Sequence, residues 1–394
     1  MRSRRATWFI ASLLFIGWLL ISYLGNADIR DYPYVFEPAD HYDLASLDSD
    51  LSLRWTFTSQ GQIITPIVFG TNQTVYIQSY KALYSLNAED GSLQWQYPIK
   101  RSGGKSIVLF DNLILLAIEN GCVLQGLDAA LGQARWELRF NDRVAARSGC
   151  SLMSRITVDQ KRAYILLSLA RGTAVIAVDP YTGEILWKAP SEIKDELPGW
   201  IMQDEESPYL YLASGGSIRT LSKENGNILK KVNKPLRSRE VPTYRDGIAY
   251  TNGGIARAVR METGHVLWAF NPRFCEDERK RTIFEPPILD RDVAYMLTTC
   301  EFMAQADLET GKSNWIAEIP QYAKSFEPVG EKGYALNPFG EMYAVDAHDG
   351  STNIVLSLEP PEIDVTTYQH LRHKDGLLIL TPGNNQAFAF DVPE

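Results

Sequence analysis

The stretch AVDPYTGEILW (177–187) decides the fold, because its rhythm recurs along most of the chain. An apolar strand leads to an acidic or polar residue, a turn glycine follows four residues later, and in the best copies a tryptophan follows four residues after that. The other copies are NAEDGSLQW (87–95), DAALGQARW (128–136), SKENGNILK (222–230), RMETGHVLW (260–268), DLETGKSNW (307–315) and DAHDGSTNI (346–354). The turn glycines are Gly91, Gly132, Gly183, Gly226, Gly264, Gly311 and Gly350. Their separation, from 38 residues (226 to 264) to 51 residues (132 to 183), is typical of four-stranded β-propeller blades.

Each recurring position of the repeat has a physical reason. A hairpin turn with positive φ favours glycine, and an aspartate such as Asp179 accepts hydrogen bonds from the backbone of its own turn. A tryptophan on the outer strand is long enough to wedge between neighbouring blades. Burial of such a ring contributes several kcal/mol, at roughly 25 cal/mol per Å² over about 200 Å². The predicted blade-packing residues are Trp55, Trp95, Trp136, Trp187, Trp268 and Trp315.

The two chain ends supply the halves of one further blade. LSLRWTF (51–57) is a tryptophan strand without a preceding turn, and QAFAFDV (386–392) is a pre-turn strand without a following one. If they pair, the tryptophan column has eight positions, two of which hold Lys230 and Ile354 instead. The sequence therefore predicts an all-β, eight-bladed β-propeller over residues 51–394, closed by its terminal strands so that no sheet edge is left open at the seam.

The first 50 residues have a different composition. Arg2, Arg4 and Arg5 precede an uncharged apolar segment, which predicts one hydrophobic helix within residues 1–27, entering the membrane through residues 7–24. The basic flank keeps the N-terminus in the cytoplasm and exports the remainder, to the cell surface or periplasm. An uncleaved anchor and a signal segment cleaved after Ala27, which would release a secreted protein, both remain open. Residues 28–50 are rich in acids and predict an acidic linker.

The repeat resembles that of pyrroloquinoline-quinone (PQQ) dehydrogenases and their non-enzymatic relatives, with a WD40-like ring, over about residues 51–394. The resemblance implies either a small PQQ-dependent dehydrogenase or a non-catalytic binding scaffold, similar to the assembly propeller of outer-membrane protein insertion machines. Quinoprotein dehydrogenases carry two adjacent cysteines beside the cofactor, and no adjacent pair exists here. We therefore favour the non-catalytic branch and assign no catalytic residue, cofactor or metal site. The chain also lacks the lipid-bearing cysteine of the assembly propellers.

Four cysteines, Cys122, Cys150, Cys275 and Cys300, allow three disulfide pairings in an exported protein. Blade topology places all four on the face opposite the glycine turns. This placement favours the local pairs 122–150 and 275–300, with four reduced buried thiols as the alternative. No CxxC motif or nearby histidine completes a zinc ligand set.

Charge and local motifs narrow the function further. The net charge is −9 and no basic stripe is present, which argues against nucleic-acid binding. We expect a monomer that binds a protein or peptide at the cysteine face, with residues 271–282 as the first choice for the contact. His370 and His373 are predicted as ordinary polar residues on a strand or loop at the start of the last blade. A sensor with a cytoplasmic partner is disfavoured, because few residues precede the hydrophobic segment.

Overall fold

A computed structural model describes residues 41–99, 106–118, 122–140, 151–152, 155–169, 172–190, 199–213, 216–275, 282–283, 285–359 and 369–393. These residues form strands and turns, and no helix occurs among them. Within this part of the chain, no segment therefore has the length and apolar character of a membrane-crossing helix. The hydrophobic helix and cleavage site predicted within residues 1–27 lie outside the described residues.

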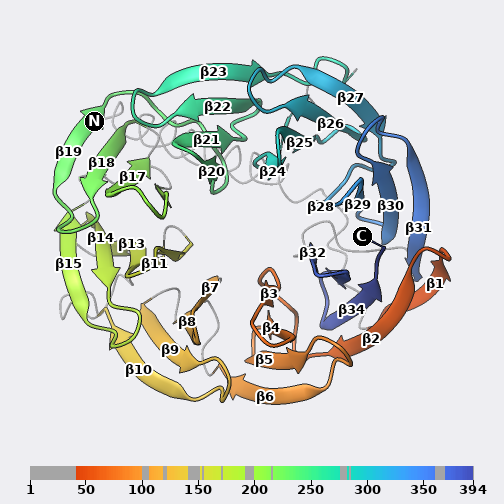
Figure 1. Cartoon of the computed structure of the whole chain (residues 1–394), viewed down its shortest axis with the longest axis horizontal. Helices are drawn as coiled ribbons and strands as arrows, with labels where there is room; N and C mark the ends of the chain where they lie inside the picture. The colour runs from red at the N-terminus through yellow and green to blue at the C-terminus, as the bar shows by residue number, and fades with distance from the viewer. Residues whose placement is uncertain are drawn as a thin grey trace, which may run out of the picture. The chain divides into compact units, whose positions relative to one another are not determined.

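The strands form eight antiparallel sheets, which are the blades of a β-propeller (Figure 1). Blades 1 to 4 contain β3 (Val68–Phe69), β4 (Thr74–Gln78), β5 (Ala82–Asn87) and β6 (Leu93–Pro98); β7 (Ser106–Phe110), β8 (Leu113–Ile118), β9 (Val123–Asp128) and β10 (Ala134–Arg139); β11 (Ser151–Leu152), β12 (Thr157–Val158), β13 (Ala163–Leu169), β14 (Gly172–Val178) and β15 (Ile185–Pro190); and β16 (Trp200–Gln203), β17 (Tyr209–Ala213), β18 (Ile218–Ser222) and β19 (Ile228–Val232). Blades 5 to 8 contain β20 (Thr243–Arg245), β21 (Ile248–Thr251), β22 (Ala256–Arg260) and β23 (His265–Phe270); β24 (Ile288–Asp290), β25 (Val293–Leu297), β26 (Phe302–Asp307) and β27 (Ser313–Glu318); β28 (Ser325–Val329), β29 (Lys332–Leu336), β30 (Glu341–Asp346), β31 (Thr352–Glu359) and β1 (Asp43–Leu47); and β32 (His370–Lys374), β33 (Leu377–Thr381), β34 (Gln386–Asp391) and β2 (Ser52–Thr58).

Each blade runs from a strand beside the central channel to a strand at the rim of the ring (Figure 1). The strands beside the channel, such as β3 and β20, are short, while the second and third strands are almost fully buried. The apolar core is divided into eight clusters, each of which joins two neighbouring blades. Stability therefore depends on blade-to-blade contacts around the whole ring.

The chain ends close blade 8, as the sequence predicts. β2 pairs antiparallel with β34, with Ser52 opposite Asp391 and Thr58 opposite Gln386. The Asp391 carboxylate accepts hydrogen bonds from the Arg54 guanidinium and from the Ser52 hydroxyl, and the Ser52 bond is 3.0 Å long. These contacts join residues more than 330 positions apart in sequence. The prediction of eight blades with a two-ended closure is confirmed.

The predicted linker of residues 28–50 ends earlier than the sequence indicates. β1 lies within it and pairs with β31, so that blade 7 gains a fifth strand at its rim (Figure 1). Tyr42 is 1% exposed, and its backbone N–H donates to the Gln386 side-chain oxygen at 2.6 Å. The acidic composition hid this strand because β1 is a rim strand whose side chains are mostly exposed. The propeller therefore includes residues 41–50 as well.

Tryptophans and turn glycines meet at the blade junctions. Trp268 on the rim strand of blade 5 packs on the Gly311 turn of blade 6, and its indole N–H donates to the Leu308 carbonyl at 2.8 Å. Gly311 has φ +68°, and an added Cβ would lie 2.6 Å from the Trp268 ring. The same pairing brings together Trp55 with Gly91, Trp95 with Gly132, Trp136 with Gly183, Trp187 with Gly226, and Trp315 with Gly350. Glycine is thus required both for its backbone conformation and for the space that the ring occupies.

Two junctions lack the tryptophan. At the junction of blades 4 and 5, Gly264 faces the side chains of Lys234 and Val232, and Lys230 forms an ion pair with Glu262 at 3.5 Å. At the junction of blades 7 and 8, Ile354 is 48% exposed. In blade 8, β34 pairs with β2 from the other end of the chain, so no glycine turn links these two strands.

Substitution of Gly311 by alanine is expected to destabilise the fold more than substitution of Gly247. Both glycines have positive φ, so each alanine costs about 1–2 kcal/mol in backbone strain. Only Gly311 faces a ring, since no atom lies within 4 Å of a Cβ added at Gly247. The clash with Trp268 should add about 1–3 kcal/mol to the loss in free energy of unfolding, measured by urea denaturation. Equal losses for the two variants would show that the tryptophan wedge contributes nothing.

Candidate functional site

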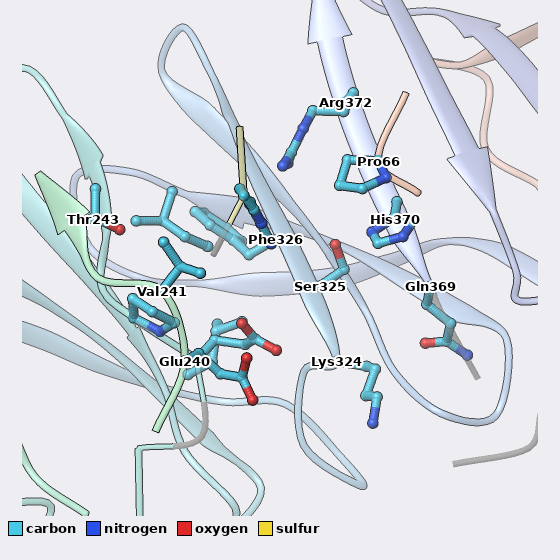
Figure 2. Close-up of a pocket in the computed structure, with 15 residues that line it drawn as sticks. Pro66, Glu240, Val241, Thr243, Lys324, Ser325, Phe326, Gln369, His370 and Arg372 are labelled. Carbon is cyan, nitrogen blue, oxygen red and sulfur yellow. The ribbon is translucent and has the colours of Figure 1, made fainter. Parts of the chain in front are cut away.

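A cavity of about 420 Å³ lies in the central channel, at the point where the strands beside the channel begin. Six blades contribute to its wall. Its lining residues are Pro66 of blade 1; Arg155 of blade 3; Glu240, Val241 and Thr243 of blade 5; Glu285, Pro286, Ile288 and Leu297 of blade 6; Lys324, Ser325 and Phe326 of blade 7; and Gln369, His370 and Arg372 of blade 8. Figure 2 shows Glu240 and Val241 on one side of the cavity, with Gln369, His370 and Arg372 on the other.

The cavity opens on the face of the ring that carries the connections between blades. In each antiparallel blade, the start of the first strand and the end of the second strand lie at the same end. The connections between blades and the loops between second and third strands therefore share one face, which we call the link face. The glycine turns lie on the opposite face, the turn face. Cys275 precedes blade 6 and Cys300 follows β25, and their disulfide lies on the link face with a Cα–Cα distance of 5.8 Å.

Charged side chains of both signs gather around the cavity. Burial raises the pKa of the Glu285 carboxyl, and the nearby Glu240 carboxylate raises it further, while Arg155, Lys324 and Arg372 act in the opposite direction. Burial lowers the pKa of Arg155, as does the neighbouring Arg372. Arg155 and Glu285 are exposed to the channel but enclosed by protein on most sides. Desolvation therefore shifts the pKa of both groups although solvent can reach them.

Blade 8 contributes an ion pair and a neutral histidine beside this charge. Arg372 contacts the Glu327 carboxylate at 3.2 Å, and the backbone N–H of His373 donates to the same carboxylate at 3.1 Å. Burial lowers the pKa of His370 to about 3, and the positive charges of Arg372 and Arg155 act in the same direction. His370 is therefore neutral at physiological pH.

Gln369 is only 6% exposed, and among the described residues neither end of its side-chain amide has a hydrogen-bond partner. The Nε2 atom of His370, the next residue, also lacks a partner within the described structure. Buried polar atoms of this kind are rare in native proteins, because each costs about 1–3 kcal/mol when it is left unpaired. At a cavity wall, such atoms are accessible to water or to a bound molecule.

Replacement of His370 by glutamine is expected to reduce the loss of stability in acid. The unfolded histidine titrates near pH 6.5, whereas the folded one stays neutral down to about pH 3. The contribution of His370 is therefore complete above pH 6.5 and is lost as the pH falls toward 3. Between pH 7 and pH 4, the wild-type urea midpoint should fall further than that of His370→Gln. His348→Gln, at an exposed turn position, serves as the control, and identical pH profiles for both variants would contradict the assignment.

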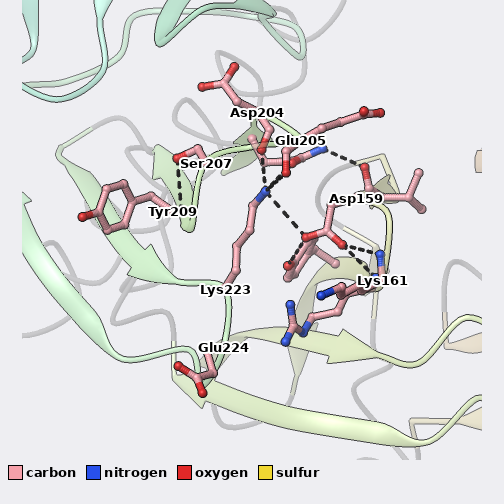
Figure 3. Close-up of polar contacts among 12 residues, drawn as sticks. Asp159, Lys161, Asp204, Glu205, Ser207, Tyr209, Lys223 and Glu224 are labelled. Atoms are coloured by element: carbon pink, nitrogen blue, oxygen red, sulfur yellow. Dashed lines mark hydrogen bonds and ion pairs between the residues drawn. The ribbon is translucent and has the colours of Figure 1, made fainter.

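A second charged cluster lies on the turn face, between blades 3 and 4 (Figure 3). Lys223 is 5% exposed, and its ammonium donates to the Gln203 side-chain oxygen at 2.6 Å and to the Asp204 carbonyl at 2.5 Å. It also lies 3.6 Å from the carboxylate of Asp159, which accepts a hydrogen bond from the Tyr164 hydroxyl at 2.7 Å. With its bonds satisfied in this way, Lys223 is a structural link between the two blades.

The structure describes one of the two predicted local cysteine pairs completely, and this pair lies on the link face. Cys275 and Cys300 are joined. Cys122 is disulfide-bonded as well, but Cys150 lies outside the described residues. Part of the predicted contact segment 271–282 also lies outside them, since positions 276–281 are not described. Among the described residues, no group of three or more His, Cys, Asp or Glu side chains is arranged to hold a metal ion.

Sequence reasoning did not single out Arg155, Glu240, Glu285, Lys324 or Gln369. Four of them stand just before the first strand of their blade, and Arg155 stands between β11 and β12; these places put the side chains at the mouth of the channel. No fixed spacing marks these positions, because Arg155 lies 28 residues before Gly183 whereas Glu240 lies 24 residues before Gly264. The short first strands also made them difficult to locate from periodicity alone.

Comparison with known proteins agrees with this architecture. A family model described as outer membrane protein assembly factor BamB matches residues 40–196 and 119–354. Together the two matches span residues 40–354 of the 394, well over half of the chain. The chain belongs to this family. BamB proteins of Yersinia pestis and Moranella endobia are each 22% identical over 249 residues, which is 60% and 59% of this chain respectively. The matched region spans about three fifths of these relatives, 59% and 61% of their lengths.

Solved structures share the fold at lower identity. The crystal structure of BamB from Moraxella catarrhalis has a TM-score of 0.61 and 13% identity, covering 86% of this chain and 99% of that one. A quinohemoprotein alcohol dehydrogenase from Pseudomonas putida HK5 has a TM-score of 0.64 and 12% identity, covering 87% and 76%. The predicted resemblance to the PQQ-type propeller family is confirmed. Because assembly factors and dehydrogenases share this fold, the fold alone does not distinguish their functions.

Proposed function

We propose that the protein is a non-catalytic scaffold that binds another protein or a peptide on the link face of its propeller, outside the cytoplasm. Membership of the BamB family, whose relatives are named for outer membrane protein assembly, is the observation that carries this proposal. The tryptophans, glycines and turn aspartates that define the repeat all make structural contacts. These repeat residues hold the ring together from the blade junctions and the turn face. Side chains on the link face are therefore free to serve another purpose.

The loops of blades 6 and 7 give the link face the features of a contact surface. Glu301, Gln321 and Tyr322 have φ values of 59°, 63° and 55°, a conformation that costs non-glycine residues about 1–3 kcal/mol each. The Cys275–Cys300 disulfide holds the neighbouring connection in place. Phe339, in the loop between β29 and β30, is 40% exposed. A rigid, strained surface that carries an exposed aromatic ring is suited to binding a protein.

We place the propeller on the outer side of a membrane, held as a monomer by residues 7–24, with cleavage after Ala27 as the alternative. The charge pattern of the N-terminal segment supports this orientation. Since β1 belongs to the propeller, the acidic spacer between membrane and ring is shorter than residues 28–50. A spacer of this composition is repelled by anionic lipid head groups and would hold the ring away from the surface.

Affinity capture from solubilised membranes tests the binding face. Phe339→Arg places a charge on the link face, and Leu131→Arg places the same charge on the turn face, where Leu131 is 62% exposed. We expect the Phe339→Arg variant to capture at least about tenfold less of a partner than the wild type does, since a buried unpaired charge costs more than 1.4 kcal/mol. Leu131→Arg should retain it. Equal capture by both variants, or loss only with Leu131→Arg, would reject the face assignment.

Addition of PQQ together with calcium tests the non-catalytic assignment. The scaffold proposal expects neither PQQ binding nor dye-linked oxidation of alcohols or sugars by the purified full-length chain. Clear oxidation that depends on both additions would replace the scaffold with a quinoprotein dehydrogenase.

A further inference from the structure

The channel cavity is lined by three cationic side chains (Arg155, Lys324 and Arg372) and by two carboxylates (Glu240 and Glu285). Arg155 and Arg372 repel each other, and so do Glu240 and Glu285. Arg372 has the Glu327 carboxylate beside it, but neither Arg155 nor Glu285 has a hydrogen-bonded or ion-paired partner among the described residues. Arg155 and Glu285 therefore each lack a close ion-pair partner, and a ligand group of opposite charge at either position would supply one.

Gln369 adds an independent sign of an absent ligand. Its amide is enclosed in the cavity wall with an unpaired N–H₂ donor and an unpaired carbonyl acceptor. Both atoms would be satisfied by a peptide group or by the ends of a small polar molecule. The neutral His370 beside it adds no charge of its own to the wall.

The size and balance of the cavity restrict the ligand class. A volume of about 420 Å³ lies in the range of small-molecule sites, and Phe326, Ile288 and Pro66 supply apolar wall. A simple anion would be attracted to Arg155 and repelled by Glu240 and Glu285. A simple cation would be attracted to Glu240 and Glu285 and repelled by Arg155. A simple anion and a simple cation are therefore both disfavoured relative to a molecule that carries both charges.

We propose that this cavity binds a small zwitterion of the amino-acid or short-peptide class. Its carboxylate lies at Arg155 and Arg372, its ammonium lies at Glu240 and Glu285, and Gln369 hydrogen-bonds its polar middle. The cavity opens on the same link face as the proposed scaffold surface, but Phe339 is not among its lining residues, and ligand binding in it requires no protein partner.

Three probes that share the same three glycine residues test the proposal on the full-length chain: triglycine, N-acetyl-triglycine and triglycine amide. The first carries both terminal charges, the second only the carboxylate, and the third only the ammonium. Saturation-transfer NMR at about 10 mM detects affinities in the millimolar range. We expect triglycine to bind at least about tenfold more tightly than either analogue, because each terminal charge makes charge-assisted hydrogen bonds.

Variants assign the two ends of the ligand. Arg155→Gln should remove most of the preference for triglycine over triglycine amide, and Glu285→Gln should remove most of its preference over N-acetyl-triglycine. Arg139→Gln and Glu262→Gln, on exposed positions away from the cavity, are the matched controls and should bind as the wild type does. Near-UV circular dichroism checks that each variant is folded.

Each contrary result overturns a defined part of the proposal. Absence of binding by all three probes, or equal binding by all three, would reject a zwitterion site. Tightest binding of N-acetyl-triglycine would show an anion site instead. Unchanged triglycine affinity in both folded cavity variants would place the binding elsewhere. The probe series on the wild-type chain decides the ligand class even if a variant does not fold.

Discussion

A chain that begins at residue 60 is expected to lose cooperative folding. It lacks β1 and β2, so β34 and β31 become open strand edges and Trp55 no longer covers the Gly91 turn. Loss of one buried tryptophan typically costs about 3–5 kcal/mol, and the Trp55 indole also donates to the Ala88 carbonyl at 2.9 Å. Together with two lost strand pairings, the deficit approaches the whole stability of a typical domain, about 5–15 kcal/mol.

Circular dichroism and urea denaturation measure this effect. The matched control is a chain that begins at residue 41, which keeps β1, β2 and the contact of Tyr42 with Gln386. We expect a single cooperative transition for the control and a broad or absent one for the shorter chain. Addition of a peptide of residues 41–58 should restore the transition. A shorter chain with an unchanged midpoint would show that the terminal strands do not close the ring.

Substitution of Lys223 by alanine is expected to destabilise the propeller by about 3–5 kcal/mol, because Asp159 would be left as a buried, unpaired carboxylate. Burial lowers the pKa of Lys223, which indicates how strongly its charge depends on the surrounding acceptors. Burial acts to raise the pKa of Asp159, but hydrogen bonds from Tyr164 and from the backbone N–H of Lys161 hold it below its usual value. The carboxylate would therefore stay charged after its partner is removed.

The double variant Lys223→Met with Asp159→Asn separates the ion pair from packing. Removing both charges should recover at least half of the loss, since a buried pair replaced by neutral groups is often close to neutral in effect. Urea denaturation at pH 7 gives the three free energies of unfolding. Lys332→Ala, which breaks an exposed pair with Asp50 at 3.2 Å, is the control and should change stability by less than about 1 kcal/mol. A Lys223→Ala loss as small as the control would contradict the account.

The fold could be predicted from the sequence because its markers have fixed physical tasks. Gly183 needs positive φ and room for Trp136, and Asp179 accepts hydrogen bonds from its own turn, so glycine recurs in seven turns and aspartate in four of them. The closure of blade 8 by the two chain ends also followed, because Trp55 fits the recurring tryptophan position. β1 was not predicted because a rim strand is exposed on most of its length and carries no apolar alternation. Its place is set by pairing with β31, which is distant in sequence.

The cavity was harder to predict for a related reason. Arg155, Glu285 and Gln369 come from blades 3, 6 and 8, and only ring closure brings them together. No short motif connects them. His370 was predicted as an ordinary polar residue, and its burial depends on the packing of blade 8 rather than on its neighbours in sequence.

Photo-crosslinking in intact cells tests the central claim, that the link face binds a partner, most directly. A photoreactive residue replaces Gln321 on the link face or Tyr181 on the turn face, where both native side chains are exposed. The account predicts a discrete crosslinked protein from position 321 and none from position 181. A discrete product from position 181 with none from position 321 would contradict it.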